Sequence, residues 1–592
     1  MTGTWTSFSV PDSSTGQFTA DVMILLTDGS VLVHNGYTSA LASANQWLRL
    51  TPDHHGRYET GSWSSQLDMK YARQWFASGV LRDGRVFCMG GEDSTAGSDT
   101  PTGEIFDPLT NQWSDISKPS AFDFVRGDCN GSVLADGRVL LGGATPSGPP
   151  SSWSKRTAIW DPHHNSWVEA GLKFGALSST DKSDPFEEET FVLLGDGSVL
   201  APAVRDTPKA QRYVPLLDEW VHVHDAPVPL AVDTLNGAGV FETGPAILLP
   251  SGKVFVIGGT GKTAVFTPGP HLNSPGSWTA GPVFPPDTSA SPNWPTLTAL
   301  DAPACLLPQG NVVCLAGTTL PDGGDYFSFN PIFLEYDPHN PSATLPKLDV
   351  QPTLPAGNWT WQSCFLLLPT GQLLCSAQTN HLFLYTPDPA SGAPHHDWRP
   401  AHIVVPECMA PGGSYRVSGI RINGLSQAVC YGDDGGMATN YPIVRLTNGL
   451  SGQVVYVRSH DFSTMSIAHT APHEHDEDRH SCRIDIPSSL PLGDWHLVVI
   501  ANGIASDTVP IRIATHCEEV RFVGKVEALA YDRFGDFDSF SLKTASGEIH
   551  HFDSAETRIG ELARRAWQER AQIAVKVDPG HPHRPAGISF VV

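Results

Sequence analysis

The chain has 592 residues, of which 40% are hydrophobic and 17% charged, and its formal net charge is −25. This charge argues against nucleic acid or an anionic membrane surface as a partner, and no apolar run approaches the roughly 20 residues that a membrane span needs. The length predicts about two to four domains, and the 56 glycines and 49 prolines favour a turn-rich all-β protein over a disordered one.

One pattern repeats along the first two thirds of the chain: an apolar run, a turn anchored by glycine, and a second apolar run. The clearest copies are residues 77–91, 131–143 and 246–259. Such pairs are typical of β-hairpins, and a period of about 50 residues is typical of propeller blades. The turn glycines, spaced 53 to 61 residues apart, are Gly29, Gly84, Gly137, Gly197, Gly252, Gly310 and Gly371. We therefore predict a seven-bladed β-propeller over residues 1–402.

The hairpins are followed by a second pair of strands. An apolar run, a proline turn and a tryptophan recur, as in residues 104–113 and 158–167. These elements predict four-stranded blades with the tryptophan packed between neighbours. Residues 3–8 resemble a tryptophan strand but precede the first hairpin, so we expect them to close the blade that begins near residue 361.

The glycine period stops after the propeller, and two further units are predicted. Residues 405–515 contain strands at a spacing that suits an immunoglobulin-like β-sandwich. Residues 518–592 should form a small α+β domain, whose helix over 555–570 has apolar residues on one face. We assign this last domain no chemistry.

The cysteines and the first residues bear on location. Most of the ten cysteines fall inside predicted strands, and they are expected to be reduced and buried, although Cys305 and Cys314 could face each other across a hairpin. The first 14 residues have neither a basic start nor an apolar segment typical of a secretory signal. We expect a cytoplasmic location, with an extracellular one left open if the chain is a trimmed mature form.

Several segments carry a resemblance to a known family. The glycine hairpins, WQSCFLLLPTG (361–371) and LPLGDWHLVVIANGIAS (490–506) make residues 1–515 similar to the galactose oxidase and glyoxal oxidase group, whose fold is a kelch-type propeller followed by an immunoglobulin-like domain. YGDDGGMATNYPIVRLTN (431–448) and YVRSHDFSTM (456–465) look like segments of a bacterial and fungal kelch subset. The resemblance implies the fold, whereas chemistry depends on the site residues.

The resemblance also implies where a copper ion would be held. The oxidases use a Tyr-His pair, a cysteine-crosslinked tyrosine and a histidine from the second domain. The positions matching the Tyr-His pair hold Trp361 and Gln362, and those of the cysteine and the crosslinked tyrosine hold Asp128 and Glu188; Met465 stands in the matching loop of the second domain. Indole offers no lone pair and a neutral amide is a poor copper ligand. We expect no copper-radical cofactor.

Counting back nine residues from each turn glycine gives one position per blade. These ring positions hold Ala20, Trp75, Asp128, Glu188, Thr243, Asp301 and Gln362. Because the innermost strands of all blades start at the same end, the side chains should line one funnel. Carboxylates there could act as general acid and base or hold Ca²⁺ or Mg²⁺, which makes Asp128, Glu188 and Asp301 candidate catalytic residues and leaves the metal unknown.

The remaining candidate residues would bind a ligand. Arg73, Trp75, Glu242, Trp361 and Gln362 lie at or near the ring positions, and the loop around His460 should roof the funnel from the second domain. Mixed aromatic and polar side chains are typical of a polar ligand site.

We therefore predict a copper-free relative of the galactose oxidase group whose acidic funnel binds a small polar ligand, most simply a carbohydrate. Catalysis by carboxylates or by a divalent cation remains open, so the sequence does not decide whether the chain is an enzyme. The alternatives are a protein-interaction or structural propeller with an inert funnel, and a divergent copper-radical oxidase. The oligomeric state is not predicted.

Overall fold

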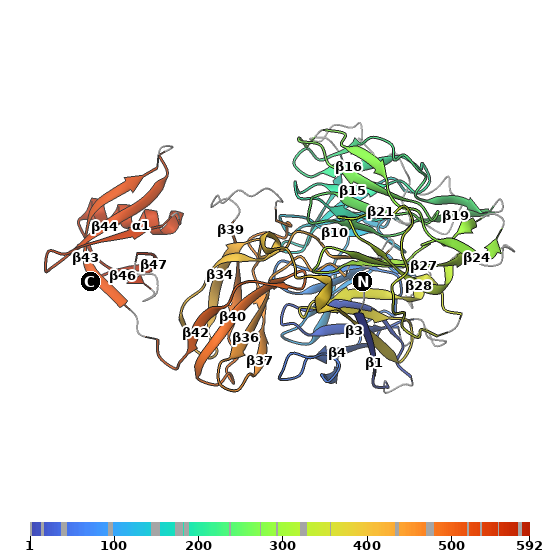
Figure 1. The fold of residues 1–592 in the computed structure, drawn as a ribbon. Helices are drawn as coiled ribbons and strands as arrows, with labels where there is room; N and C mark the ends of the chain where they lie inside the picture. The colour runs from blue at the N-terminus through green and yellow to red at the C-terminus, as the bar shows by residue number, and fades with distance from the viewer. Residues whose placement is uncertain are drawn as a thin grey trace.

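The computed structural model describes residues 3–12, 17–36, 44–92, 99–143, 154–171, 182, 189–235, 238–272, 274–291, 294–319, 328–355, 357–431, 437–468, 479–517, 520–532, 535–554, 556–577 and 583–591. Over these ranges the chain is all-β with a single α-helix, and many of its sheets have four strands (Figure 1).

Seven of the four-stranded sheets in the described ranges each contain one glycine-turn hairpin. The first four sheets are β2 (Ala20–Leu25), β3 (Val31–Asn35), β4 (Trp47–Thr51) and β5 (Ser62–Ser65); β6 (Ala77–Val80), β7 (Val86–Met89), β8 (Gly103–Asp107) and β9 (Gln112–Asp115); β10 (Gly131–Val133), β11 (Val139–Gly142), β12 (Thr157–Asp161) and β13 (Ser166–Ala170); and β14 (Val192–Leu193), β15 (Val199–Pro202), β16 (Ala210–Val214) and β17 (Glu219–His222).

The other three are β20 (Ala246–Leu248), β21 (Val254–Ile257), β22 (Thr263–Thr267) and β23 (Ser277–Ala280); β35 (Val429–Tyr431), β26 (Pro303–Leu306), β27 (Val312–Thr319) and β28 (Ser328–Tyr336); and β29 (Cys364–Leu367), β30 (Leu373–Ser376), β31 (His381–Pro387) and β1 (Gly3–Ser9). Two further hairpins, not expected from the sequence, lie between these sheets: β18 (Val232–Leu235) with β19 (Ala238–Glu242), and β24 (Pro286–Ser291) with β25 (Trp294–Thr296).

The seven sheets are arranged in a circle. Their innermost strands contact one another in chain order: β6 with β10, β10 with β14, β14 with β20, β20 with β26, β26 with β29, and finally β29 with β2. Sheets that radiate from a circle of inner strands form a β-propeller. The glycine turns take the left-handed conformation that the hairpins require, as at Gly84 with φ of 85°.

The expected closing strand is confirmed. β1 pairs antiparallel with β31 along its whole length, from Gly3 opposite Pro387 to Ser9 opposite His381. Trp5 of this strand packs against Tyr385, with ring centroids 5.0 Å apart, and its indole N–H donates to the Val350 carbonyl at 3.0 Å. The N-terminal end of the chain thereby ties the last sheet of the circle to the first.

The outer-strand tryptophans join neighbouring sheets. Trp113, Trp167 and Trp278 occupy equivalent places in their sheets, and each donates its indole N–H to a carbonyl of the segment that leaves the preceding sheet. The acceptors are Leu67, Ser117 and His224, at 2.8, 3.1 and 2.7 Å. The repeated tryptophan of the sequence is therefore a packing and hydrogen-bonding device between blades.

Two sheets follow the propeller, and we call them together the second unit. One consists of β32 (Ala401–Val404), β34 (Ser414–Ile420), β39 (Arg479–Asp485) and β38 (Ser459–His460); the other of β33 (Cys408–Met409), β42 (Val509–Ile513), β40 (Gly493–Ala501), β36 (Ile443–Asn448) and β37 (Val454–Val457), with β41 (Ile504–Ala505) paired to β40. Their facing apolar residues, Val417 and Trp495 among them, belong to the same hydrophobic cluster as the neighbouring blades.

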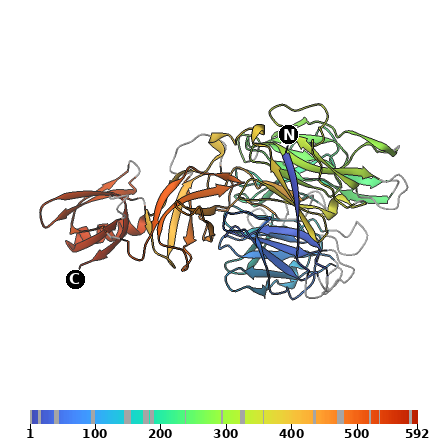
Figure 2. The same ribbon diagram turned by 60° about the horizontal axis from the view of Figure 1, so that its bottom comes forward.

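The last described part of the chain, residues 520–591, is the C-terminal unit. It is a five-stranded sheet in the order β45 (Ile549–Asp553), β44 (Phe537–Thr544), β43 (Val520–Tyr531), β46 (Gln572–Val577) and β47 (Pro585–Phe590), with α1 (Thr557–Glu569) packed on it. The helix buries Ile559, Ala563 and Ala566, as its apolar spacing indicates. Propeller, second unit and C-terminal unit follow one another along the molecule in both views (Figures 1 and 2). None of the helices in the described ranges is long and apolar enough to cross a membrane.

One disulfide bond departs from the expectation of reduced cysteines. Cys408 and Cys517 are joined across a separation of 109 residues, at the two ends of the second unit. The other eight cysteines are free, and seven of them are buried. Cys305 and Cys314 are both among the free ones, because in the hairpin Cys305 lies opposite Val313 and Cys314 opposite Ala304.

Candidate functional site

The inner strands give the propeller two different ends. In the first sheet, β2 begins at the ring position Ala20 and leads into the turn of Gly29, so ring positions and glycine turns lie at opposite ends of the strands. The second unit contacts the turn end. Its backbone N–H groups at Ser459, Phe462 and Met465 donate to the carbonyls of Thr27, Arg82 and Ala135, in the turns of the first three sheets.

His460 consequently lies away from the ring positions. Its imidazole contacts the carboxylates of Asp461 and Asp485 at 3.1 and 3.0 Å. Burial alone would raise the pKa of Asp485, but hydrogen bonds from Ser414, His460 and Arg458 outweigh it and lower the pKa. The loop around His460 anchors the second unit to the blade turns, which corrects the expectation that it roofs the funnel.

A different segment of the second unit enters the propeller. β35 pairs antiparallel with β26, with Tyr431 opposite Pro303 and Val429 opposite Cys305, and it also contacts β20 and β29. A strand that touches three innermost strands lies at the centre of the circle. A small cavity of about 40 Å³ lies beside it. We call β35 the central strand; it reaches the level of the ring positions, because Pro303 is two residues from Asp301.

Two tryptophans predicted to line the funnel meet there. The rings of Trp75 and Trp361 lie edge to face, with centroids 5.6 Å apart, although they belong to the second and the last sheet. The ring position of the first sheet, between them, holds the buried Ala20. The hydroxyl of Tyr431 donates to the Trp361 carbonyl at 2.6 Å and so ties the central strand to this pair. The half-buried indoles and buried Tyr431 form an aromatic group at the ring end.

Strained backbone marks two of the ring positions. Trp75 has φ of 48° and Asp301 has φ of 51°, a left-handed conformation that costs free energy in residues other than glycine. Such strain persists only where the surrounding structure fixes it, and it is concentrated at functional sites. The two residues are the second and sixth members of the predicted ring.

The carboxylates at and next to the ring positions differ in how far they are buried. Asp301 is 9% exposed and its N–H donates to the Thr243 carbonyl at 2.8 Å, which brings two ring positions together. Glu242, next to Thr243, is 7% exposed, and Asp128 is half-buried beside the buried Cys129. Glu188 lies outside the described residues. Across the ranges that the structure describes, no group of three or more His, Cys, Asp and Glu side chains is placed to hold a metal ion.

The side chain of Arg73 binds groups of its own sheet. Its guanidinium is fully buried and binds the Glu104 carboxylate at 2.9 Å, and it donates to the carbonyls of Gly90 and Thr102 at 2.6 and 2.8 Å. Both terminal nitrogens of the guanidinium bind groups of the same sheet, whereas its buried Nε has no hydrogen-bond partner among the described residues. The structure therefore gives Arg73 a role inside the blade, and its ligand-binding role stays a prediction.

Gln362 ends a short 3₁₀ turn, Thr360–Gln362, directly before β29. Its side-chain oxygen Oε1 accepts from the backbone N–H of Trp359 at 2.8 Å, and its side-chain Nε2 donates to Gln378 at 3.2 Å. Gln378 in turn donates to the buried Asp21, beside the buried His34. The amide therefore holds the turn that presents Trp361.

The residues at the implied copper positions do not fit a copper ion. Trp361 offers no lone pair, and the oxygen of Gln362 already accepts a backbone hydrogen bond. Copper(II) in proteins takes imidazole, phenolate or thiolate ligands, and at the described ring positions no such side chain is found. We therefore derive no chemical step through copper.

Comparisons of the sequence with known proteins also indicate a kelch repeat. The Kelch motif model matches residues 76–120, the second sheet. Spermatocyte protein spe-26 of Caenorhabditis elegans is 28% identical over 123 residues, and the match spans only a fifth of either chain. The kelch match and the circle of four-stranded sheets agree on a kelch-type propeller.

Two solved structures are similar in shape. A fungal alcohol oxidase of the AA5 family in complex with copper has a TM-score of 0.48 and 14% identity, covering 86% of this chain and 99% of that one. The WD40 β-propeller domain of Doa1 has a TM-score of 0.37 and 11% identity, covering 66% of this chain and 98% of that one. Likenesses at this level say nothing about what the chain binds.

Proposed function

We propose that the chain is a seven-bladed, copper-free relative of the galactose oxidase group that binds a small polar ligand, a carbohydrate, at the ring end of its propeller. In this proposal residues 405–515 form an immunoglobulin-like domain, apart from the central strand, and residues 518–592 a small α+β domain. The observation that carries the proposal is the edge-to-face pair of Trp75 and Trp361, formed by residues 286 positions apart and held by Tyr431.

The chemistry of the ring end suits a sugar. An indole presents a flat apolar face to the C–H groups of a pyranose ring, while carboxylates accept hydrogen bonds from its hydroxyls. Asp128 and Asp301 supply such acceptors, and the left-handed backbone of Asp301 is a strain typical of functional sites. Because the central strand occupies the middle of the propeller, the ligand would enter from the end opposite the second unit.

Catalysis is an extension of the same site. If Asp128 and Asp301 face the bound sugar from two sides, one carboxyl could donate a proton to a glycosidic oxygen while the other assists a water molecule. Ca²⁺ or Mg²⁺ held by the same oxygens is the alternative form. A change in saccharide hydrolysis by the variants Asp128→Asn and Asp301→Asn would separate an enzyme from a binding protein.

The binding proposal is tested by titrating the full chain with a panel of mono- and oligosaccharides, followed by saturation-transfer NMR. Trp75→Ala and Trp361→Ala should each weaken binding roughly tenfold, since a stacked aromatic ring contributes on the order of 1 kcal/mol beyond its buried area. Trp567→Ala is the matched control, because this tryptophan is 49% exposed on the C-terminal unit. Binding that survives both ring substitutions would refute the proposal.

The copper-free part is tested separately by metal analysis of the purified chain. We expect no stoichiometric copper after incubation with Cu²⁺ and dialysis, and no radical signal on oxidation. One tightly held copper per chain would favour the divergent oxidase instead.

A further inference from the structure

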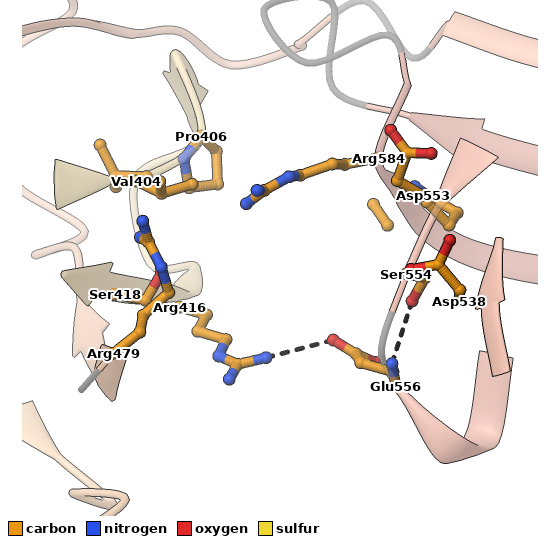
Figure 3. A pocket seen from close by; sticks show the side chains of 13 residues that line it. Val404, Pro406, Arg416, Ser418, Arg479, Asp538, Asp553, Ser554, Glu556 and Arg584 are labelled. Carbon is orange, nitrogen blue, oxygen red and sulfur yellow. Dashed lines mark hydrogen bonds and ion pairs between the residues drawn. The ribbon is translucent and has the colours of Figure 1, made fainter. Parts of the chain in front are cut away.

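A second cavity lies far from the propeller, between the second unit and the C-terminal unit. Its volume is about 570 Å³, within the range of roughly 300 to 1,000 Å³ that small-molecule sites occupy. Ligand sites occur preferentially where two folded units meet. Figure 3 shows the side chains that enter this cavity from both sides.

The wall from the second unit is basic. Arg416 and Ser418 lie two residues apart on β34 and so share one face of the sheet. Arg479 of the neighbouring strand β39 lies opposite Ile420, which is on the same face. The guanidinium of Arg479 donates through Nη1 to the His402 carbonyl at 3.0 Å, which holds the charged end of the side chain. Arg416 and Arg479 therefore enter the cavity from the same face of the sheet, at places four residues apart along β34.

A third guanidinium comes from the other wall. Arg584 extends from the C-terminal unit into the cavity, toward the side that carries Arg416 and Arg479 (Figure 3). Only one ion pair crosses the cavity between described residues: Arg416 to Glu556, at 3.1 Å, with both side chains 61% exposed. The lining combines these three guanidinium groups with the carboxylates of Asp538, Asp553 and Glu556, so it offers both cationic and anionic groups to a ligand. Guanidinium groups are suited to carboxylate and phosphate, whose oxygens they can bind in pairs.

A covalent bond within the second unit lies close in sequence to the cavity lining. Cys408 comes two residues after Pro406, which lines the cavity, and its partner Cys517 comes three residues before β43 of the C-terminal unit. The C-terminal unit therefore follows a cross-linked end of the second unit.

We propose that this cavity is a binding site for a small ligand with an oxyanion group, a carboxylate or a phosphate, bound by Arg416, Arg479 and Arg584. Asp538 and Asp553, on the opposite wall, would accept hydrogen bonds from hydroxyl or amino groups of the same ligand. The carboxylate of Glu556 occupies Arg416 until the ligand displaces it. The site is independent of the proposed carbohydrate site of the propeller.

The test is calorimetric titration of the full chain at low ionic strength, with inorganic phosphate in one arm and gluconate in the other. Saturable one-to-one binding of phosphate alone identifies a phosphate ligand, and binding of gluconate alone a carboxylate. Arg584→Gln and Arg479→Gln should each weaken binding roughly tenfold, because charge-assisted hydrogen bonds are lost. Glu556→Gln should strengthen it, because the competing carboxylate is removed.

The controls separate a built site from general charge. Arg558→Gln removes an exposed arginine of α1 that does not line the cavity, and it should leave binding unchanged. The proposal is overturned if neither anion binds, if Arg584→Gln binds like the unaltered chain, if Arg558→Gln weakens binding as much as Arg584→Gln does, or if Glu556→Gln weakens it.

Discussion

The buried ion pair between Arg73 and Glu104 should contribute to the stability of the second blade, and its substitution tests how much. Both side chains are at most 1% exposed, and the pair is 2.9 Å long. Arg73 also donates to the carbonyls of Gly90 and Thr102, and Glu104 accepts from the Lys70 N–H at 2.7 Å. Substitution of one partner leaves the other charge buried without compensation, which costs about 3 to 5 kcal/mol.

We therefore expect Arg73→Met and Glu104→Gln each to destabilise the propeller by about 3 to 5 kcal/mol. The double variant Arg73→Met with Glu104→Gln leaves no buried charge, so its cost should fall about 2 kcal/mol or more below the sum of the two single changes. Urea unfolding followed by tryptophan fluorescence measures each cost from the transition of the propeller.

Two results would refute this reasoning. Single changes that cost less than about 1 kcal/mol would mean that the pair is not desolvated as the structure shows. A stable Arg73→Met variant that no longer binds saccharide would show that Arg73 contributes to ligand binding and not to the stability of the blade.

Three smaller predictions concern the junctions between parts of the chain. Cys408→Ser opens the cross-link to Cys517 and should lower the stability of the second unit by about 2 to 4 kcal/mol, seen as an earlier unfolding midpoint without reductant; equal midpoints would contradict it. The pKa of Asp485 lies below its ordinary value of 3.8, so its stabilising contribution is present above that pH and is lost as the pH falls below it. An acid unfolding curve should show this loss, and Asp485→Asn should flatten it. Trp113→Phe keeps the ring but removes the indole N–H, and should cost about 1 kcal/mol in the same urea assay, whereas no change would make the inter-blade bond unimportant.

The parts of the fold that were predictable depend on local signals. Turn glycines and alternating apolar runs fix hairpins from adjacent residues, which is why the blade strands and the closing strand at residues 3–9 were found. In the C-terminal unit the apolar spacing over 555–570 located the helix, which the structure places at Thr557–Glu569.

The unpredicted parts depend on contacts between distant residues. The central strand has only three residues, and its partner lies more than a hundred positions away, so no periodicity reveals it. The Cys408–Cys517 pairing likewise cannot be deduced from the order of cysteines. At the candidate site, counting from the glycines located Trp75 and Trp361, because register determines position along a strand. Counting from the glycines does not determine where a side chain points. The contact of Arg73 with Glu104, inside its own sheet, could therefore not be predicted in this way.

The central strand also bears on whether the propeller can fold without the second unit. A chain cut after residue 402 would keep every glycine hairpin, yet it would lose the partner of β26 and leave the apolar edge of that strand facing water. We therefore expect the propeller and the second unit to fold as one piece, because one strand of a propeller sheet comes from beyond the boundary that the sequence indicates.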